Sequence, residues 1–197
     1  MSDGASNYRF WIYLLVGIGL VLGGLFGYEF IYRYPIWTLH AFWVPSSSMC
    51  PTICEGERIF VEMRGEQPYV PQKGDVIVFK QRSEPANYIK RVIGVPGDLV
   101  APGANNTILV NGQPWQAPSV CAKSLLPSPT NADASVYTGF KEIRVPPDQL
   151  FVIGDNLYNS FDSRIEQFGP VTSEQVLGRP VLIYWSPDGA RIGCPVQ

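Results

Sequence analysis

The longest hydrophobic run in the chain lies near its N-terminus. Residues 10–28 read FWIYLLVGIGLVLGGLFGY, which is 19 residues without a charged side chain. An α-helix needs roughly 20 apolar residues to cross the hydrocarbon core of a bilayer. Tyrosine and tryptophan residues stand at both ends of the run, as in the aromatic belts of membrane interfaces. The pattern predicts an N-terminal segment, residues 1–34, that contains one transmembrane helix.

The same run could instead be the apolar part of a cleaved secretory signal. Such a signal has a basic start and a small-residue A-x-A cleavage site. Arg9 is the only basic side chain before the run, and no A-x-A sequence directly follows it, so an uncleaved anchor is favoured. The flanking charges, Arg9 before the run and Glu29 and Arg33 after it, say little about orientation.

From residue 35 onward the pattern changes to short runs of β-branched and aromatic residues bounded by turn residues, which is typical of strands. The runs are GDVIVFK (74–80), YIKRVIGV (88–95), TILVNGQPW (107–115), KEIRV (141–145), LFVIGDN (150–156) and PVLIYW (180–185). We therefore expect a mainly β domain over residues 35–197, built as an antiparallel or barrel-like sheet, with a small β insertion at approximately residues 99–147.

Local signals add turns to this picture. Asn111-Gly112 is a strong hairpin signal, and Pro96-Gly97 suits the centre of a type II turn. The spacing of Thr172 and Gln175 is that of a capping box, which predicts a short helical turn that Gly178 can end.

Composition limits the classes of partner and cofactor. The chain has 15 basic and 17 acidic residues and a net charge of −2, so there is no electrostatic case for nucleic acid. The four cysteines, Cys50, Cys54, Cys121 and Cys194, lack Cys-x-x-Cys spacing and histidine partners, so neither zinc nor another cofactor is expected. In an oxidising compartment one pair could form a disulfide, and the sequence leaves the pairing open.

Candidate chemistry begins with three consecutive serines in VPSSSMCPT, residues 44–52. In an extended chain Ser46 and Ser48 project to one side and Ser47 to the other, so that one could attack while the other stabilises an oxyanion. A serine nucleophile needs a base. The single histidine, His40, lies in an apolar run with no acid marked to orient it, so a Ser-His-Asp triad is possible but unsupported.

A neutral lysine is the alternative base. The ordinary pKa of lysine is about 10.4, so a lysine must be desolvated to accept a proton near neutrality. Lys90 lies in the run NYIKRVIGVPGD, where Tyr88 and Val92 share its strand face and Arg91 points away. An ordinary surface lysine is the competing interpretation.

Four blocks in this order resemble the type I signal peptidases, membrane-anchored Ser/Lys proteases that remove signal peptides from exported proteins. The blocks are PSSSMCPT (45–52), GDVIVF (74–79), YIKRVIGVPGD (88–98) and GDNLYNSFDSR (154–164), and all follow the apolar N-terminal run.

The resemblance implies roles for individual residues. Ser48 matches the nucleophile, Lys90 the general base, and Ser46 the second oxyanion donor beside the Ser48 N–H. Ser160 matches a serine that hydrogen-bonds the lysine. Asp162 and Arg164 match an ion pair that braces the site.

Substrate recognition follows from the same resemblance, because the family accepts small residues of an Ala-x-Ala type in two shallow pockets. Core packing is the competing interpretation for each position that matches a pocket wall. These positions are Phe42, Val44, Met49, Ile53, Val78, Tyr88 and Ile89.

Two departures from the family pattern stand out. Leu157 occupies a position that is usually arginine, which puts a peripheral contact in doubt but leaves Ser160, Asp162 and Arg164 in place. Cys50 lies two residues after Ser48 and could pair with Cys54, for which the chemistry itself has no need.

The resemblance thus implies a membrane-bound serine endopeptidase. It would act on preproteins that bear signal peptides, at a plasma or thylakoid-type membrane, with its β domain on the extracytoplasmic side. A self-cleaving factor like the bacterial SOS repressors is less apt, because an apolar run stands where the DNA-binding head would be. A catalytically inactive, membrane-anchored β module that binds export partners is the alternative from another class.

Overall fold

The structure, a computed structural model, describes residues 17–19, 21–24, 38–65, 69–81, 85–104, 107–117 and 140–196. The chain divides into two compact units, Met1–Leu39 and His40–Gln197. In the first unit, residues 17–19 and 21–24 are helical, and the rest of the apolar run at 10–28 lies outside the described residues. No helix within these ranges is both long and apolar enough to span a bilayer. The transmembrane anchor therefore stays a prediction.

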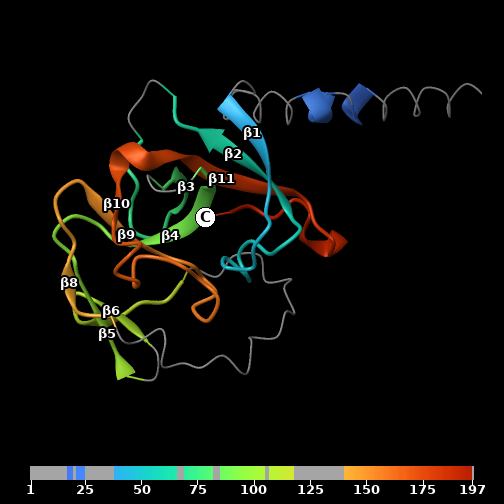
Figure 1. Cartoon of the computed structure of the whole chain (residues 1–197). Helices are drawn as coiled ribbons and strands as arrows, with labels where there is room; N and C mark the ends of the chain where they lie inside the picture. Colours follow the sequence, from blue (N-terminus) through green and yellow to red (C-terminus); the bar gives the residue numbers. More distant parts are fainter. Residues whose placement is uncertain are drawn as a thin grey trace, which may run out of the picture. The chain divides into compact units, whose positions relative to one another are not determined.

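The second unit is built on a seven-stranded sheet in the order β1-β2-β11-β3-β4-β9-β10 (Figure 1). Neighbouring strands from β2 to β10 run antiparallel. The strands are Leu39–Trp43 (β1), Arg58–Met63 (β2), Val76–Lys80 (β3), Asn87–Gly94 (β4), Gln149–Ile153 (β9), Val171–Thr172 (β10) and Val176–Trp185 (β11). This curled sheet confirms the prediction of a mainly β, antiparallel fold.

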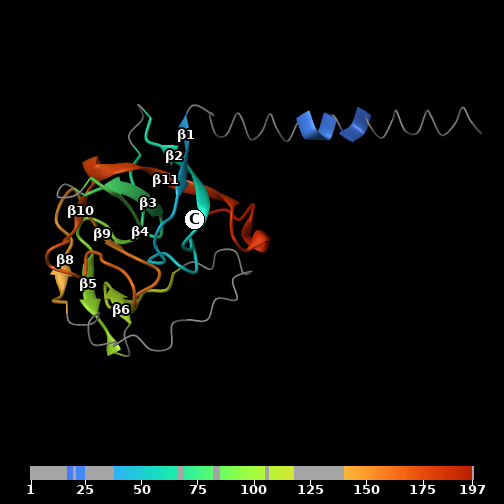
Figure 2. The same ribbon diagram turned by 45° about the vertical axis from the view of Figure 1, so that its right-hand side comes forward.

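A smaller sheet in the order β7-β6-β5-β8 is formed by the part of the chain between β4 and β9, which are themselves paired in the larger sheet. Its strands are Leu99–Pro102 (β5), Ile108–Val110 (β6), Gln113–Pro114 (β7) and Ile143–Arg144 (β8). Both views place β5, β6 and β8 at the end of the domain away from β1 and β2 (Figure 2). The hairpin β6–β7 turns at Asn111 and Gly112, whose φ angles of 53° and 78° are the positive values that a type I′ turn requires.

The core explains why β3 reads as an uninterrupted apolar run. Val76 and Val78 on one face pack into a cluster with Met49 and Ile53, which belong to the segment between β1 and β2. Ile77 and Phe79 on the other face pack into a second cluster, which includes Val92 and Phe168. Because both faces of β3 are covered, no polar position interrupts its sequence.

The structure also departs from the strand predictions. Strands β1 and β2 were not among the predicted runs, because the edge strand β1 (LHAFW) includes a histidine and an alanine and β2 (RIFVEM) carries charged residues near both ends. Thr172 and Gln175 do form a capping box, on the 3₁₀ helix η4 (Ser173–Gln175). Gly178 does not end that turn. It lies buried inside β11, where a side chain would meet the backbone of β2, and this close approach accounts for the glycine.

Candidate active site

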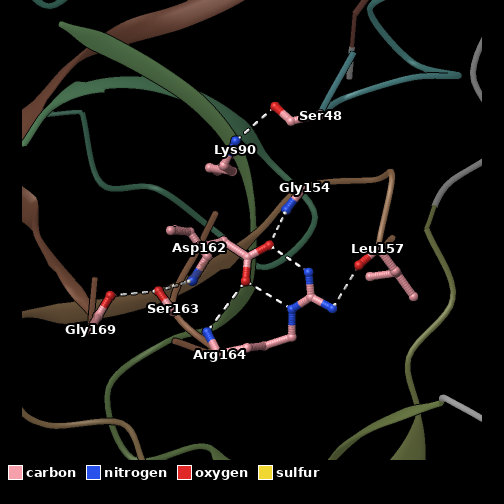
Figure 3. A network of polar contacts seen from close by, with 9 residues as sticks. Ser48, Lys90, Gly154, Leu157, Asp162, Ser163, Arg164 and Gly169 are labelled. Carbon is pink, nitrogen blue, oxygen red and sulfur yellow. Dashed lines mark hydrogen bonds and ion pairs between the residues drawn. The ribbon is translucent and has the colours of Figure 1, made fainter. Parts of the chain in front are cut away.

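Ser48 and Lys90 lie in hydrogen-bond contact although 42 residues separate them in the chain. Ser48 belongs to the segment between β1 and β2, residues 44–57, which we call the serine loop, and Lys90 projects from β4. The distance from Lys90 Nζ to Ser48 Oγ is 2.8 Å, and the two side chains point toward each other (Figure 3). His40, the other candidate base, is exposed on β1.

Burial of Lys90 changes its acid–base properties. Its side chain is 3% exposed, and loss of hydration is the main reason that its pKa falls from 10.5 to about 8. Within that net shift the carboxylate of Asp162 acts to raise the pKa, Arg164 acts to lower it, and Asp155 acts to raise it. The amine lies 6.0 Å from the centre of the Tyr88 ring, on the strand face predicted from the sequence. An appreciable fraction of Lys90 is therefore neutral near pH 7.

The three serines make different contacts. The Ser48 N–H donates to Ser46 Oγ at 3.2 Å. The Ser47 hydroxyl instead accepts from the side-chain amide of Asn159 at 2.8 Å, and the Ser47 carbonyl accepts from Asn156. Ser46 thus lies at the backbone of Ser48, while Ser47 connects the loop to the segment after β9.

Ser160 differs from what the family resemblance implies. Its side chain is buried, and its hydroxyl has no hydrogen-bond partner among the residues that the structure describes. The implied hydrogen bond to Lys90 is therefore not formed in this conformation. Ser160 still lies beside the site: a Cβ on Gly154 would meet Ser160 Oγ at 2.3 Å and the Ser48 carbonyl at 2.4 Å. Only glycine fits between these two groups.

Asp162 and Arg164 form a buried, two-pronged ion pair. Arg164 Nε donates to Asp162 Oδ1 and Arg164 Nη2 to Asp162 Oδ2, each at 2.8 Å. Asp162 Oδ2 also accepts from the Gly154 N–H at 3.0 Å (Figure 3). Arg164 Nη1 donates to the carbonyl of Leu157. Because Leu157 contributes its backbone here, this contact does not depend on its side chain.

A second ion pair was missed in the sequence. Arg91 lies on the strand face opposite Lys90, as predicted, but it is buried and makes two hydrogen bonds to Asp155 at 2.8 and 2.7 Å. Thr52 of the serine loop donates to the same carboxylate, and the Asn156 N–H donates to the Ser48 carbonyl at 3.0 Å. The signal was Asp155 in the GDN block, whose partner could not be identified without the fold.

A third ion pair holds the far end of the serine loop. Arg191, in the 3₁₀ helix η5 (Gly189–Arg191), donates to Glu57 at 2.6 Å and to the Thr52 carbonyl at 3.0 Å. The Glu57 carboxylate also accepts from the Cys54 N–H and from Ser186. Glu57 and Arg191 are 1% and 2% exposed. Nothing local in the sequence links residues so far apart.

Most of the implied pocket residues belong to the core. Val44, Met49, Ile53 and Val78 are at most 4% exposed and form one cluster, against which Phe42 and Ile89 pack. Tyr88 packs against the second cluster. Phe42, Tyr88 and Ile89 are only partly buried, so of the seven they have most surface to offer a substrate.

The three cysteines in the described ranges are disulfide-bonded. Cys50 and Cys54 form a disulfide within the serine loop. Cys194 is also disulfide-bonded, and Cys121 lies outside the described residues. Across the ranges given above, no group of three or more His, Cys, Asp or Glu residues could hold a metal ion.

Comparison with known proteins identifies the family. The family model described as signal peptidase, peptidase S26, matches residues 15–185. A signal peptidase I of Leptolyngbya laminosa is 35% identical over 151 residues, which cover 73% of this chain and 67% of that protein. Signal peptidase I P of Bacillus subtilis subsp. natto is 31% identical over 148 residues, which cover 75% and 78%. The chain therefore belongs to the signal peptidase family, as the four sequence blocks predicted.

A solved signal peptidase I from Enterococcus faecalis is 24% identical and covers 57% of this chain and 98% of that one. The TM-score between the two structures is 0.40.

The buried amine predicts a stability effect that is independent of catalysis. The gap between a pKa of 10.5 and about 8 corresponds to about 3 kcal/mol disfavouring the charged form in the folded state. Because the folded pKa is depressed, stability is gained as pH rises from about 8 to 10.5. Lys90→Met should therefore be more stable than the wild type at pH 7, by up to about 3 kcal/mol, and this advantage should disappear by pH 10.5. Urea unfolding of both proteins at the two pH values tests this, and an advantage independent of pH would contradict it.

Proposed function

We propose that this protein is a signal peptidase I that cleaves by a Ser48/Lys90 dyad. The observation that carries the proposal is the 2.8 Å contact between the Ser48 hydroxyl and a buried lysine amine, in a chain of the signal peptidase family. In the reaction, neutral Lys90 accepts the Ser48 proton while Ser48 Oγ attacks the scissile carbonyl. Lys90 then returns the proton to the leaving amine, and water hydrolyses the ester by the same route in reverse.

The oxyanion would be bound by the Ser48 N–H and the Ser46 hydroxyl. Two such donors aimed at developing negative charge commonly contribute much of the catalysis in acyl transfer. In the present conformation the Ser48 N–H donates to Ser46 Oγ. A substrate carbonyl must therefore replace that internal acceptor, and the Ser46 hydroxyl must rotate to donate to the oxyanion.

The supporting residues act on the positions of the dyad. The Asp162–Arg164 pair fixes the Gly154 N–H, and Gly154 in turn separates Ser160 from the Ser48 backbone. The Ser160 hydroxyl, which has no hydrogen-bond partner in the described part of the chain, can hold the Lys90 amine once that amine rotates away from Ser48 during the reaction. Ser160 is therefore proposed as a partner of the lysine in a later step rather than in the resting state.

The proposed substrates are preproteins with N-terminal signal peptides that end in an Ala-x-Ala type of site. Side chains of this size suit walls made by Phe42, Tyr88 and Ile89. Phe42 and Ile89 pack against one buried apolar cluster and Tyr88 against another. A well-packed wall excludes larger side chains by overlap. Metal and cofactor have no part in the proposed mechanism.

We further propose a single N-terminal membrane anchor with the β domain on the extracytoplasmic side. The apolar run at 10–28 supports the anchor. Disulfides persist mainly in oxidising compartments. The disulfide-bonded cysteines Cys50, Cys54 and Cys194 therefore support the extracytoplasmic location of the β domain.

Substitution of each serine tests which one is the nucleophile. Ser48→Ala should abolish cleavage of an Ala-x-Ala precursor in detergent, because it removes the attacking oxygen. Ser46→Ala should lower kcat by about 10²–10³-fold, the usual loss for one oxyanion donor. Ser47→Ala is the matched control and should retain most activity. A folded Ser48→Ala protein as active as the wild type would refute the dyad, and a wild type without activity would favour the inactive binding module.

The pH dependence of kcat/KM tests which group is the base. Lys90 can accept a proton only when it is neutral, so activity should rise with pH through an apparent pKa of about 8. His40→Ala should leave this acidic limb unchanged. Lys90→Ala should remove activity without unfolding the protein, as judged by circular dichroism. If a residually active Lys90→Ala protein kept the same acidic limb, Lys90 would not be the base.

Protease protection tests the topology. In membranes that hold the full chain, protease added from the cytoplasmic face should leave the β domain intact, because the bilayer shields it. Digestion of residues 40–197 from that face in sealed vesicles would contradict the proposed orientation.

A further inference from the structure

The Cys50–Cys54 disulfide lies in the serine loop, only two residues beyond Ser48. Its two half-cystines are four residues apart, so it encloses a very short ring. The stabilisation from a disulfide grows only with the logarithm of the length of the loop that it closes. A bridge this short therefore adds less to global stability than a long-range one, and its most direct effect is on local geometry.

One end of the bridge is attached to a rigid part of the domain. The Cys54 N–H donates to the Glu57 carboxylate at 2.7 Å, and Glu57 is held by Arg191. The Thr52 carbonyl inside the ring accepts from the same guanidinium. All of these groups are buried, so Cys54 has little freedom to move.

The other end of the bridge reaches the nucleophile. Cys50 directly follows Met49, whose side chain is buried with 1% exposure. The Cys50 N–H donates to the Ser47 carbonyl at 3.0 Å, which closes a turn around Ser48. The bridge therefore connects the turn at Ser48 to the fixed Glu57–Arg191 pair by covalent bonds.

We propose that the Cys50–Cys54 disulfide is a positioning element for Ser48 and that it makes cleavage depend on the oxidised state of the serine loop. The inference rests on the proposed function, because it assigns the disulfide a part in the Ser48/Lys90 reaction. The 2.8 Å contact between Ser48 and Lys90 is held by the loop. A nucleophile misplaced by about 1 Å can lose on the order of 10²-fold in rate.

The bridge is also open to chemical reduction. Cys50 is partly exposed and Cys54 is 8% exposed, so a small thiolate can approach Cys50 Sγ. A dithiol reductant would transfer two electrons and two protons to the bridge, giving two cysteine thiols, and would itself be oxidised to a disulfide. Cys50 would then be joined to Cys54 only through the backbone of residues 51–53.

The experiment compares the full-length wild type with Cys50→Ser/Cys54→Ser, each before and after treatment with dithiothreitol. Cleavage of an Ala-x-Ala precursor in detergent gives kcat and KM. Mass mapping after alkylation shows whether Cys50 and Cys54 are reduced, and circular dichroism shows whether the fold is kept. Reoxidation of the reduced wild type provides a second, reversible measurement.

The expected result is a lower kcat with a nearly unchanged KM. Reduction of the wild type should lower kcat by about ten-fold to a hundred-fold with KM changed less than about two-fold, since the substrate-facing core is intact. Reoxidation should restore kcat. The double variant should have the lower kcat without treatment and should not respond to dithiothreitol, which separates this disulfide from the one at Cys194.

Three results would overturn the proposal. The first is a double variant with wild-type kcat. The second is equal slowing of both proteins by dithiothreitol, which would place the effect at another disulfide. The third is a change in KM alone. Each of these leaves the proposed function standing if the untreated wild type cleaves and Ser48→Ala does not. An untreated wild type that fails to cleave would overturn both.

Discussion

The burial of Lys90 against Ser48 is the constraint on which the rest of the domain depends. A lysine amine far from water is costly while it is charged, so the surrounding fold has to supply the stability that this residue lowers. β4 supplies a central position in the sheet, with β3 and β9 on either side. The absence of a side chain at Gly154 then lets both Ser160 and the Ser48 carbonyl lie close to it. The geometry of the site is thus fixed by a close contact that tolerates no additional atom.

Three buried ion pairs connect the site to the fold. Their presence is better explained by the segments that they hold in place than by a contribution to stability. A buried pair commonly contributes little net stability, whereas loss of one partner costs about 3–5 kcal/mol. Arg91–Asp155 and Arg191–Glu57 both reach Thr52, one by its hydroxyl and one by its carbonyl. The serine loop is therefore held at one residue from two sides. Asp162–Arg164 instead holds the segment after β9.

Local patterns in the sequence predicted those features that depend on neighbouring residues. The runs of β-branched residues gave β3, β4 and β9, and Asn111-Gly112 gave the hairpin, because backbone preference and strand alternation act over a few positions. The strand face of Lys90 followed from the same alternation. β1 and β2 were not predicted because their sequences mix apolar residues with polar or charged ones. The Arg191–Glu57 pair was not predicted because its members are 134 residues apart and meet only when η5 packs against the serine loop.

The roles of individual residues were harder to predict than the fold. The four blocks indicated the family and brought attention to Ser48 and Lys90, whose side chains the fold brings together. The lack of a hydrogen-bond partner for the Ser160 hydroxyl among the described residues was not predictable, because a hydroxyl can rotate between partners that differ by small distances. The pocket positions show a similar ambiguity, since packing a core and lining a substrate wall demand the same apolar residues.

The pairing of charges around Lys90 determines how strongly dissolved salt can affect the proton affinity of this residue. Asp162 and Arg164 act on the amine in opposite directions, and their side chains are 0% and 3% exposed. Asp155 is likewise paired, with Arg91. Dissolved ions screen exposed charges over a Debye length of about 8 Å at physiological ionic strength, but they act weakly on buried pairs. The proton affinity of Lys90 is thus set inside the fold, and changes in external salt have little means of altering it.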